Sequence, residues 1–320
     1  MRECWKASQR HRSPLHALVW HQQVREDVAS GHGTQLQSRS RMACSSRGAE
    51  MDQAFAYTTL PKLGRSVYRL GLSASYRPGK ETVHKALDTG LNFFFCYGFD
   101  GQMIRVLREL APRTRENLVI ATGAYNLLWW YPNLRRTLEK RLRQLRTDYI
   151  DVFLLLGVMG KETYLARALE ELHRLCEEGK VRAIGISTHN RKLAGRLAAE
   201  GALEALMMRY NAAHRGAEQD IFPHLAQHNP IVMNHTATRW TYLLRRPRGW
   251  PKDGRVPTAG MCYRFVLSNP HVHVCLTAPR SVREFDENLA AIAQGPLSDE
   301  EMRFMQEFGD AVHAMKKWFM

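Results

Sequence analysis

The chain lacks the patterns that mark a membrane span, a metal centre or a disulfide framework. No apolar run in its 320 residues approaches the roughly 20 residues that a transmembrane helix needs. The six cysteines are scattered without a C-x-x-C pair, and no H-E-x-x-H occurs among the 14 histidines, so the usual spacings of metal ligands are missing. In a chain of this length, scattered cysteines are typical of free thiols in a reducing compartment. We therefore expect a cytoplasmic protein with no membrane segment and no metal.

Acidic side chains are fewer than basic ones in this sequence. The sequence has 46 Lys and Arg against 31 Asp and Glu, which gives a net charge of +15. Such an excess favours acidic ligands, including the phosphates of a nucleotide, or weak attachment to nucleic acid. The plainer interpretation, which we favour, is a surface of solvated helices. The stretch Arg135–Arg146 supports it, because its leucines take one face of a predicted helix and its arginines the other.

A second basic stretch, Arg245–Lys252, lies in a long predicted loop. Such loops often cover the mouth of a site as lids. Alternatively, this loop contacts phosphates, with Trp250 as a stacking surface. Nucleic acid is the less favoured partner.

Residues 1–50 differ from the rest of the chain. They are rich in Arg, Ser, His and Gln and show no sustained hydrophobic period. The apolar cluster around Leu15–Trp20 is too short for the core of a signal peptide. We interpret residues 1–50 as a disordered extension, or as an artefact of translation upstream of Met51, and residues 51–320 as one domain.

From about Tyr57 onwards, short apolar runs alternate with longer amphipathic stretches. The run Ile150–Leu156 is continuously apolar, which is typical of a strand buried on both faces of a parallel sheet. Eight strands are predicted in all: Val67–Leu72, Asn92–Phe95, Leu118–Thr122, Ile150–Leu156, Val181–Ser187, Ala205–Tyr210, Ile231–Asn234 and His273–Thr277.

This alternation predicts right-handed crossovers and a parallel sheet. Eight strand–helix units permit closure into a (β/α)₈ TIM barrel. A doubly wound sheet has the same alternation, but the number of units favours the barrel. No G-x-G-x-x-G follows the first strand, so the usual mark of a Rossmann site is missing.

Several of these segments carry a family likeness. Gly179–Ser187 closely matches the join before the fifth strand of the aldo/keto reductase family, Thr147–Leu155 is similar to its fourth-strand motif, and Gly90–Phe94 resembles its second strand. The resemblance covers roughly residues 60–310 and is read from these motifs together. It implies a (β/α)₈ barrel that binds NADP(H) across the carboxyl ends of the strands and reduces a small carbonyl substrate.

The resemblance also implies where the cofactor binds. Ser187 and Thr188 stand where the family's Ser-Asn pair holds the nicotinamide amide, with Thr in place of Asn. Arg280 and the helix start that follows suit the 2′-phosphate, because guanidinium captures phosphate in a bidentate way. We expect Ser187, Asn211 and Arg280 to converge around one dinucleotide. The full set of expected cofactor residues is Ser187, Thr188, Asn211, Arg280, Ser281, Glu284 and Asn288.

The chain departs from the family at its proton-transfer residues. In the family a Tyr donates the proton, a Lys paired with an Asp lowers its pKa, and a His orients the carbonyl. The Asp, Lys and His positions are here Phe95, Gly123 and Leu156. The Tyr position is Asp100 in an ungapped comparison, which we prefer, or Tyr97 if three residues are deleted. Since at least three of the four groups are replaced, the usual mechanism is expected to be absent.

Three residues remain as candidate catalytic groups. Asp100 is a carboxyl donor if burial raises its pKa, or a helix N-cap. Tyr97 is either a catalytic phenol or a wall residue. His189, near the predicted mouth, either orients a carbonyl or belongs to a helix start, and His235 at the end of the seventh strand lines the mouth or packs in the core.

Two functions follow from these residues. The first is an NADP(H)-binding oxidoreductase with atypical catalytic groups, and the second is a non-catalytic barrel that binds the cofactor as a sensor or partner subunit. A weaker third is a barrel that has lost the nucleotide as well. The substrate and the oligomeric state are not predicted.

Overall fold

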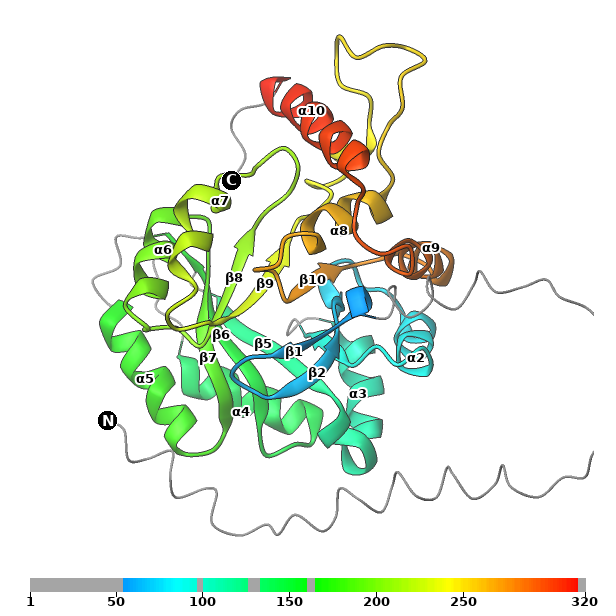
Figure 1. Cartoon of the computed structure of the whole chain (residues 1–320). Helices are drawn as coiled ribbons and strands as arrows, with labels where there is room; N and C mark the ends of the chain where they lie inside the picture. The colour runs from blue at the N-terminus through cyan, green and yellow to red at the C-terminus, as the bar shows by residue number, and fades with distance from the viewer. Residues whose placement is uncertain (1–53, 97–99, 126–132, 160–164, 316–320) are drawn as a thin grey trace, which may run out of the picture. The chain divides into compact units, whose positions relative to one another are not determined.

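The computed structural model describes residues 54–96, 100–125, 133–159 and 165–315. Within them, eight parallel strands close into a barrel, with β10 next to β3 and the others in chain order between them. Helices lie outside the strands (Figure 1). This confirms the (β/α)₈ TIM barrel predicted from the alternation of apolar runs.

The barrel strands bury alternate side chains in opposite directions. Phe93, Phe95, Val152, Leu154 and Leu156 belong to one apolar cluster that fills the barrel, while a larger cluster lies between the strands and the helices. The strands are β3 (Leu70–Ser73), β4 (Phe93–Phe95), β5 (Val119–Tyr125), β6 (Ile150–Val158), β7 (Val181–Thr188), β8 (Ala205–Arg209), β9 (Ile231–His235) and β10 (Val274–Thr277).

The helices begin at residues that satisfy their first backbone amides. Asn133 caps α4 and Asn190 caps α6, each accepting a hydrogen bond from the amide three residues on. None of the described helices is long and apolar enough to cross a membrane. The helices are α2 (Lys80–Asp88), α3 (Gly101–Thr114), α4 (Leu134–Leu145), α5 (Leu165–Glu177), α6 (Arg191–Ala199), α7 (Ala217–Asp220), α8 (Ala259–Leu267), α9 (Val282–Ile292) and α10 (Asp299–Met315), with short 3₁₀ turns between some of them.

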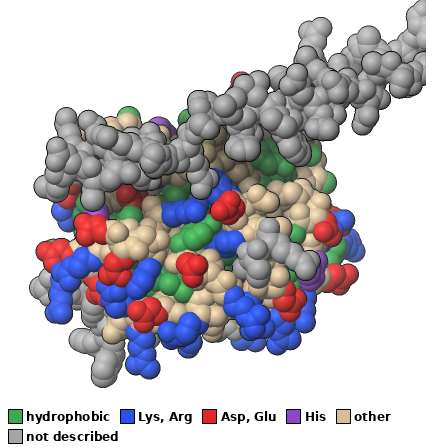
Figure 2. Space-filling view, turned by 90° about the horizontal axis from the view of Figure 1, so that it is seen from below, with side chains coloured by type: hydrophobic (Ala, Val, Ile, Leu, Met, Phe, Trp, Pro, Cys, Tyr) green, Lys and Arg blue, Asp and Glu red, His purple; other side chains and the backbone are tan. Residues whose placement is uncertain are grey.

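The basic face predicted for α4 is only partly solvated. Arg135 pairs with Glu178 on the surface. Arg141, however, is 4% exposed, and its Nε donates to Thr122 Oγ1 at 3.3 Å. Figure 2 shows one face of the molecule on which Lys and Arg side chains are interspersed with Asp and Glu, as on an ordinary solvated surface.

The first predicted strand, Val67–Leu72, is wrong as a single element. The chain first forms an antiparallel hairpin of β1 (Tyr57–Leu60) and β2 (Arg65–Tyr68), and the barrel strand begins only at Leu70. The break falls at Arg69, whose guanidinium donates to the carbonyls of Leu267 and Val272 at 2.8 Å each. An arginine inside an apolar run therefore marks the junction of two strands.

The hairpin closes the amino-terminal end of the barrel. Leu60 and Val67 are fully buried and belong to the apolar cluster that fills the barrel. Asn92, just before β4, donates to the carbonyl of Ser66 at 2.9 Å and accepts from the amide of Tyr68 at 3.0 Å. These contacts leave the carboxyl ends of the strands as the open end.

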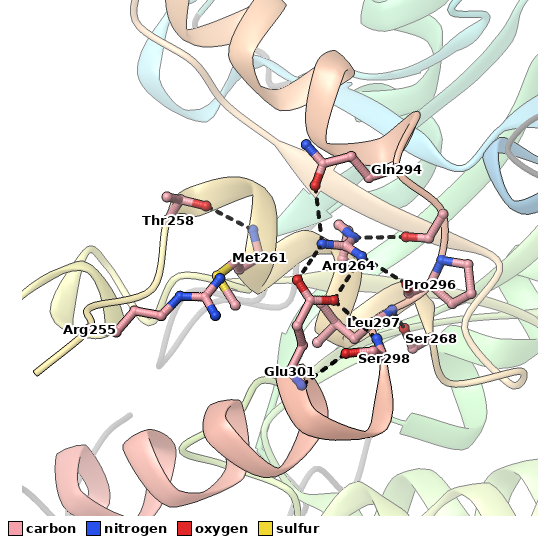
Figure 3. A network of polar contacts seen from close by, with 11 residues as sticks. Arg255, Thr258, Met261, Arg264, Ser268, Gln294, Pro296, Leu297, Ser298 and Glu301 are labelled. Carbon is pink, nitrogen blue, oxygen red and sulfur yellow. Dashed lines mark hydrogen bonds and ion pairs between the residues drawn. The ribbon is translucent and has the colours of Figure 1, made fainter. Parts of the chain in front are cut away.

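Helix α9 is fixed in place by a buried arginine of α8. Arg264 donates to the carbonyls of Gly295 and Pro296 at 2.8 Å and pairs with Glu301 at 3.0 Å (Figure 3). Glu301 also accepts from the amide of Ser298, whose hydroxyl accepts from the amide of Glu301, so the two form a capping box at the start of α10. One side chain thus joins α8, the turn after α9 and the start of α10.

Candidate functional site

A cavity of about 910 Å³ lies at the carboxyl ends of the barrel strands. Its walls come from residues at or just after β3, β5, β6, β7, β9 and β10, and from α9. In barrels of this kind the carboxyl ends of the strands are where ligands bind. The cavity is therefore the candidate site.

The positions expected to lack proton-transfer groups are apolar in the structure. Phe95 is fully buried in the cluster that fills the barrel, and Leu156 lines the cavity. A Cβ added at Gly123 would collide with the backbone oxygen of Leu154 and the side chain of Leu156. Leu156 thus presents an apolar side chain to the cavity, Phe95 belongs to the same apolar cluster, and the packing at Gly123 leaves no room for a side chain.

Asp100 takes the helix N-cap position. Its Oδ1 accepts from the amides of Gln102 at 2.9 Å and Met103 at 3.4 Å, at the start of α3. The residue is 1% exposed and is not among the described residues that line the cavity. The structure thus shows the capping alternative rather than a carboxyl group facing the cavity. Tyr97 lies outside the described residues.

Arg280 lies at one end of the cavity, beside the start of α9. Its guanidinium is exposed and lies 5.7 Å from the ring centroid of Tyr76. Ser281 caps α9 by accepting from the amide of Glu284 at 3.2 Å, and the Glu284 carboxylate accepts from the amide of Arg280 at 2.8 Å. The Ser281 hydroxyl and the Arg280 amide are therefore already bonded within the turn, whereas the guanidinium lies near Tyr76, another residue that lines the cavity.

Asn288 lies one helical turn beyond Glu284, and both line the cavity. Its amide nitrogen donates to Thr277 Oγ1 at 3.2 Å, and that hydroxyl is 3.0 Å from the hydroxyl of Tyr263. The chain of contacts fixes the side chain of Asn288 against β10.

Of the three residues expected at the nicotinamide end, the structure places Ser187 alone on the cavity wall. Thr188 is buried, and its hydroxyl donates to the carbonyl of Val158 at 2.6 Å. Asn211 is fully buried; its amide nitrogen donates to the carbonyl of Thr236 at 2.9 Å and its oxygen accepts from the amide of Ala213 at 3.1 Å. Ser187 and Arg280 therefore line the same cavity, whereas Asn211 is not among the described lining residues and bonds to the loop after β9.

Two histidines face each other at the floor of the cavity. His189 follows β7, His235 ends β9, both line the cavity, and their ring centroids are 5.5 Å apart, edge to face. Burial, and then the charge of Arg209, lowers the pKa of His189. Burial, His189 and Arg209 together lower the pKa of His235 to about 3. Both rings are therefore neutral at pH 7.

Sequence reasoning missed Arg209. It is the last residue of β8 and pairs in register with His235 of β9. Burial, with the nearby charges of Arg191 and Arg239, lowers its pKa to about 10, so it stays charged at neutral pH. The strand period was the available signal: Ala205 and Met207 face the barrel interior, and Arg209 is the next residue in that alternation.

Aromatic side chains form part of the cavity rim. Tyr76, Tyr125 and Trp240 line the cavity and are 52%, 45% and 44% exposed. Tyr76 ends the 3₁₀ turn after β3, Tyr125 ends β5 and Trp240 lies in the loop after β9, so their gathering cannot be predicted from spacing along the chain. Trp250, predicted as a stacking surface, instead packs on Phe308 of α10 at a centroid distance of 4.9 Å.

The loop after β9 is held in an unusual backbone conformation. Four residues of this loop have a positive φ, in the left-handed region that residues with a Cβ disfavour. The values are 61° for Thr236, 50° for Arg239, 52° for Trp240 and 70° for Thr241. Arg239 is fully buried beneath the loop; it donates to Nε2 of His214 at 3.1 Å and to the carbonyl of Val312 at 3.0 Å. These bonds hold the loop that carries Trp240.

Known proteins resemble the chain in sequence and in fold. An uncharacterized oxidoreductase, YqkF of Bacillus subtilis (strain 168), is 20% identical over 262 residues, which cover 70% of this chain and 85% of that protein. The holo form of aldo-keto reductase AKR11C1 from Bacillus halodurans has a TM-score of 0.67 at 21% identity, covering 80% of this chain and 96% of that one. An aldo/keto reductase from Klebsiella pneumoniae, in complex with NADP and acetate, has a TM-score of 0.63 at 23% identity, covering 77% and 93%.

These structural likenesses, at the identities given, establish the shared fold. The sequence model of the Aldo/keto reductase family matches residues 70–248, which is more than half of the chain. The chain therefore belongs to the aldo/keto reductase family.

Proposed function

We propose that this protein is an NADP(H)-binding oxidoreductase that interconverts a carbonyl compound and its alcohol with an atypical set of catalytic groups. One observation carries the proposal: Arg280 and Ser187 line the same cavity at the carboxyl ends of the strands. Its volume of about 910 Å³ lies within the usual range of ligand sites. The Klebsiella pneumoniae relative, whose structure contains NADP, has the same fold.

The residues near α9 suit the phosphate end of the cofactor. The exposed guanidinium of Arg280 has the planar, bidentate geometry that phosphate prefers. Tyr76 beneath it offers an aromatic face on which a planar base stacks. Ser281 acts indirectly in this proposal, by capping the helix that carries Glu284 and Asn288. Thr188 and Asn211 likewise support the walls.

At the nicotinamide end of the cofactor, the proposed chemistry differs from the usual mechanism of the family. NADPH, when bound, supplies a hydride to the carbonyl carbon, and the carbonyl oxygen takes up a proton. The imidazoles of His189 and His235 are neutral at pH 7, so each has one N–H that orients the oxygen by hydrogen bonding, with water as the source of the proton. Without a strong general acid, we expect turnover about a hundredfold or more below that of a reductase with the full set.

A non-catalytic NADP(H)-binding barrel is the second candidate. The observation that favours it is the packing at three positions: Phe95 and Leu156 belong to one apolar cluster, and a Cβ at Gly123 would meet the backbone of Leu154. Such a protein would act as a sensor of the cofactor or as the partner of another subunit. It shares the cofactor site with the first candidate and differs only in turnover.

Titration of the purified full chain with NADPH, followed by a carbonyl panel, tests both candidates. We expect saturable binding, seen as a change in nicotinamide fluorescence, and slow consumption of NADPH with some carbonyl compounds. Binding without turnover across the panel would favour the non-catalytic barrel. If NADPH does not bind at all, both candidates fail.

A further inference from the structure

Three neighbouring strands bring two imidazoles to the cavity wall and place an arginine next to them, although the arginine is not among the described residues that line the cavity. His189 follows β7, Arg209 ends β8 and His235 ends β9, and the sheet register sets Arg209 directly beside His235. The two imidazoles line the cavity, and the Arg209 guanidinium is close enough to perturb both. The family resemblance assigns no shared role to these three side chains.

Among the described residues, four basic side chains disfavour a further positive charge on these three groups. They are Arg191, Arg209, Arg239 and His189. Arg191 has a carboxylate partner in Asp220, at 2.7 Å, on the outer side of α6. A half-buried site with this potential stabilises a bound anion, because the low local dielectric strengthens the attraction.

A polar atom of His189 without a hydrogen-bond partner also supports a ligand site here. Nδ1 of His189 is buried and makes no hydrogen bond to any described residue. A buried polar atom without a partner carries a desolvation cost that a ligand can remove. The opposite side of the floor is apolar, formed by Leu156 and Met207. The floor therefore offers donors on one side and a hydrophobic surface on the other.

We propose that this floor is a carboxylate subsite, formed by His189 and His235 and backed by the charge of Arg209, and that the substrates are oxo-acids. The inference rests on the proposed function for its carbonyl chemistry, while the carboxylate subsite itself does not require turnover. The carboxylate accepts from one of the two imidazole N–H groups, while the other N–H donates to the neighbouring carbonyl oxygen. The apolar part of the substrate packs on Leu156 and Met207. Reduction of such a substrate by NADPH and a proton gives a hydroxy acid and NADP⁺.

The test compares a 2-oxo acid with its methyl ester, because the pair shares the carbonyl and differs in charge. Phenylpyruvate and methyl phenylpyruvate are titrated calorimetrically into the full chain, with and without saturating NADPH. We expect the acid to bind at least about tenfold more tightly than the ester, as hydrogen bonds to charged groups do. Equal affinities for the two compounds would overturn the subsite.

Two substitutions locate the effect. Arg209→Met is expected to abolish the preference for the acid, and Arg209→Lys to keep most of it, with the NADPH affinity unchanged in both. Arg174→Met, which removes an equal charge from the exposed face of α5, serves as the control and should keep the preference. If Arg209→Met folds poorly, His235→Asn replaces it, with the same loss expected. A preference that survives loss of both side chains would contradict the proposal.

Failure of the proposed function and failure of the carboxylate subsite give different results in these experiments. If the chain binds the acid but turns over no carbonyl compound, the oxidoreductase proposal fails and the subsite stands. If NADPH is turned over with uncharged aldehydes as well as with acids, and the acid has no advantage, the enzyme stands and the subsite fails.

Discussion

At the residue scale, the three positions at which we expect the chain to depart from its family are tightly packed by their surroundings. Phe95 and Leu156 belong to one apolar cluster inside the barrel, so each is packed rather than merely tolerated. Gly123 lies where β5 approaches β6 so closely that a Cβ would meet the backbone of Leu154. The packing at these three positions thus suits apolar side chains at 95 and 156 and a glycine at 123.

Gly123 provides a direct check on that packing. Gly123→Ala is expected to destabilise the fold by about 1–3 kcal/mol, because the added methyl group must displace the backbone of β6 or the side chain of Leu156. Urea unfolding measures the change. Gly101→Ala is the matched control, since nothing lies within 4 Å of a Cβ at Gly101, and it should be close to neutral. Equal stability of the two variants would show that the floor is looser than the structure indicates.

The buried histidines make stability depend on pH. The folded-state pKa of His235 is about 3, below the ordinary value of 6.5, because burial and two basic neighbours disfavour its charged form. The unfolded chain therefore takes up the proton first, and the stability that the neutral ring provides above pH 6.5 is lost as the pH falls towards 3. His235→Gln should reduce the loss of stability between pH 7 and pH 5 by on the order of 1 kcal/mol, measured by urea unfolding at the two pH values. If the parent chain and His235→Gln lose the same stability between pH 7 and pH 5, the ring of His235 is hydrated in the folded protein.

At the element scale, the cofactor end depends on how α9 is supported. Arg264 holds the turn after α9 through two carbonyls and pairs with Glu301, and Ser281 caps the other end of the helix. The position of Arg264 in α8 does not indicate this role, since its partners lie about 30 residues further along the chain. Tertiary contacts of this kind are beyond local sequence patterns.

Arg264→Met is expected to lower the free energy of unfolding by about 3–5 kcal/mol, because it leaves a part-buried Glu301 and two carbonyls without their donor. Thermal and urea unfolding report the loss. Arg283→Met on α9 removes a charge that is 88% exposed and should change stability by less than about 0.5 kcal/mol. If both substitutions cost the same, the network in Figure 3 does not support the helix.

At the scale of the whole molecule, the closed parallel barrel could be predicted because the repeating strand–helix pattern has few other solutions. The hairpin β1–β2 could not, because the end of β2 shares one apolar run with the barrel strand β3 and only Arg69 separates the two. Arg280, Glu284 and Asn288 were expected at the cofactor from the family resemblance, and the structure brings all three to the cavity. Arg209 and the aromatic rim were missed, since they are close in space and distant along the chain.

The central claim is that one cavity holds the dinucleotide, with Arg280 at its phosphate end. The most direct measurement is the ratio of the dissociation constants of NADH and NADPH for the parent chain, Arg280→Ala and the exposed control Arg283→Ala. We predict that the parent and Arg283→Ala bind NADPH more tightly than NADH, and that Arg280→Ala loses about tenfold or more of that preference with little change in NADH affinity. A ratio that is the same in all three proteins would contradict the claim.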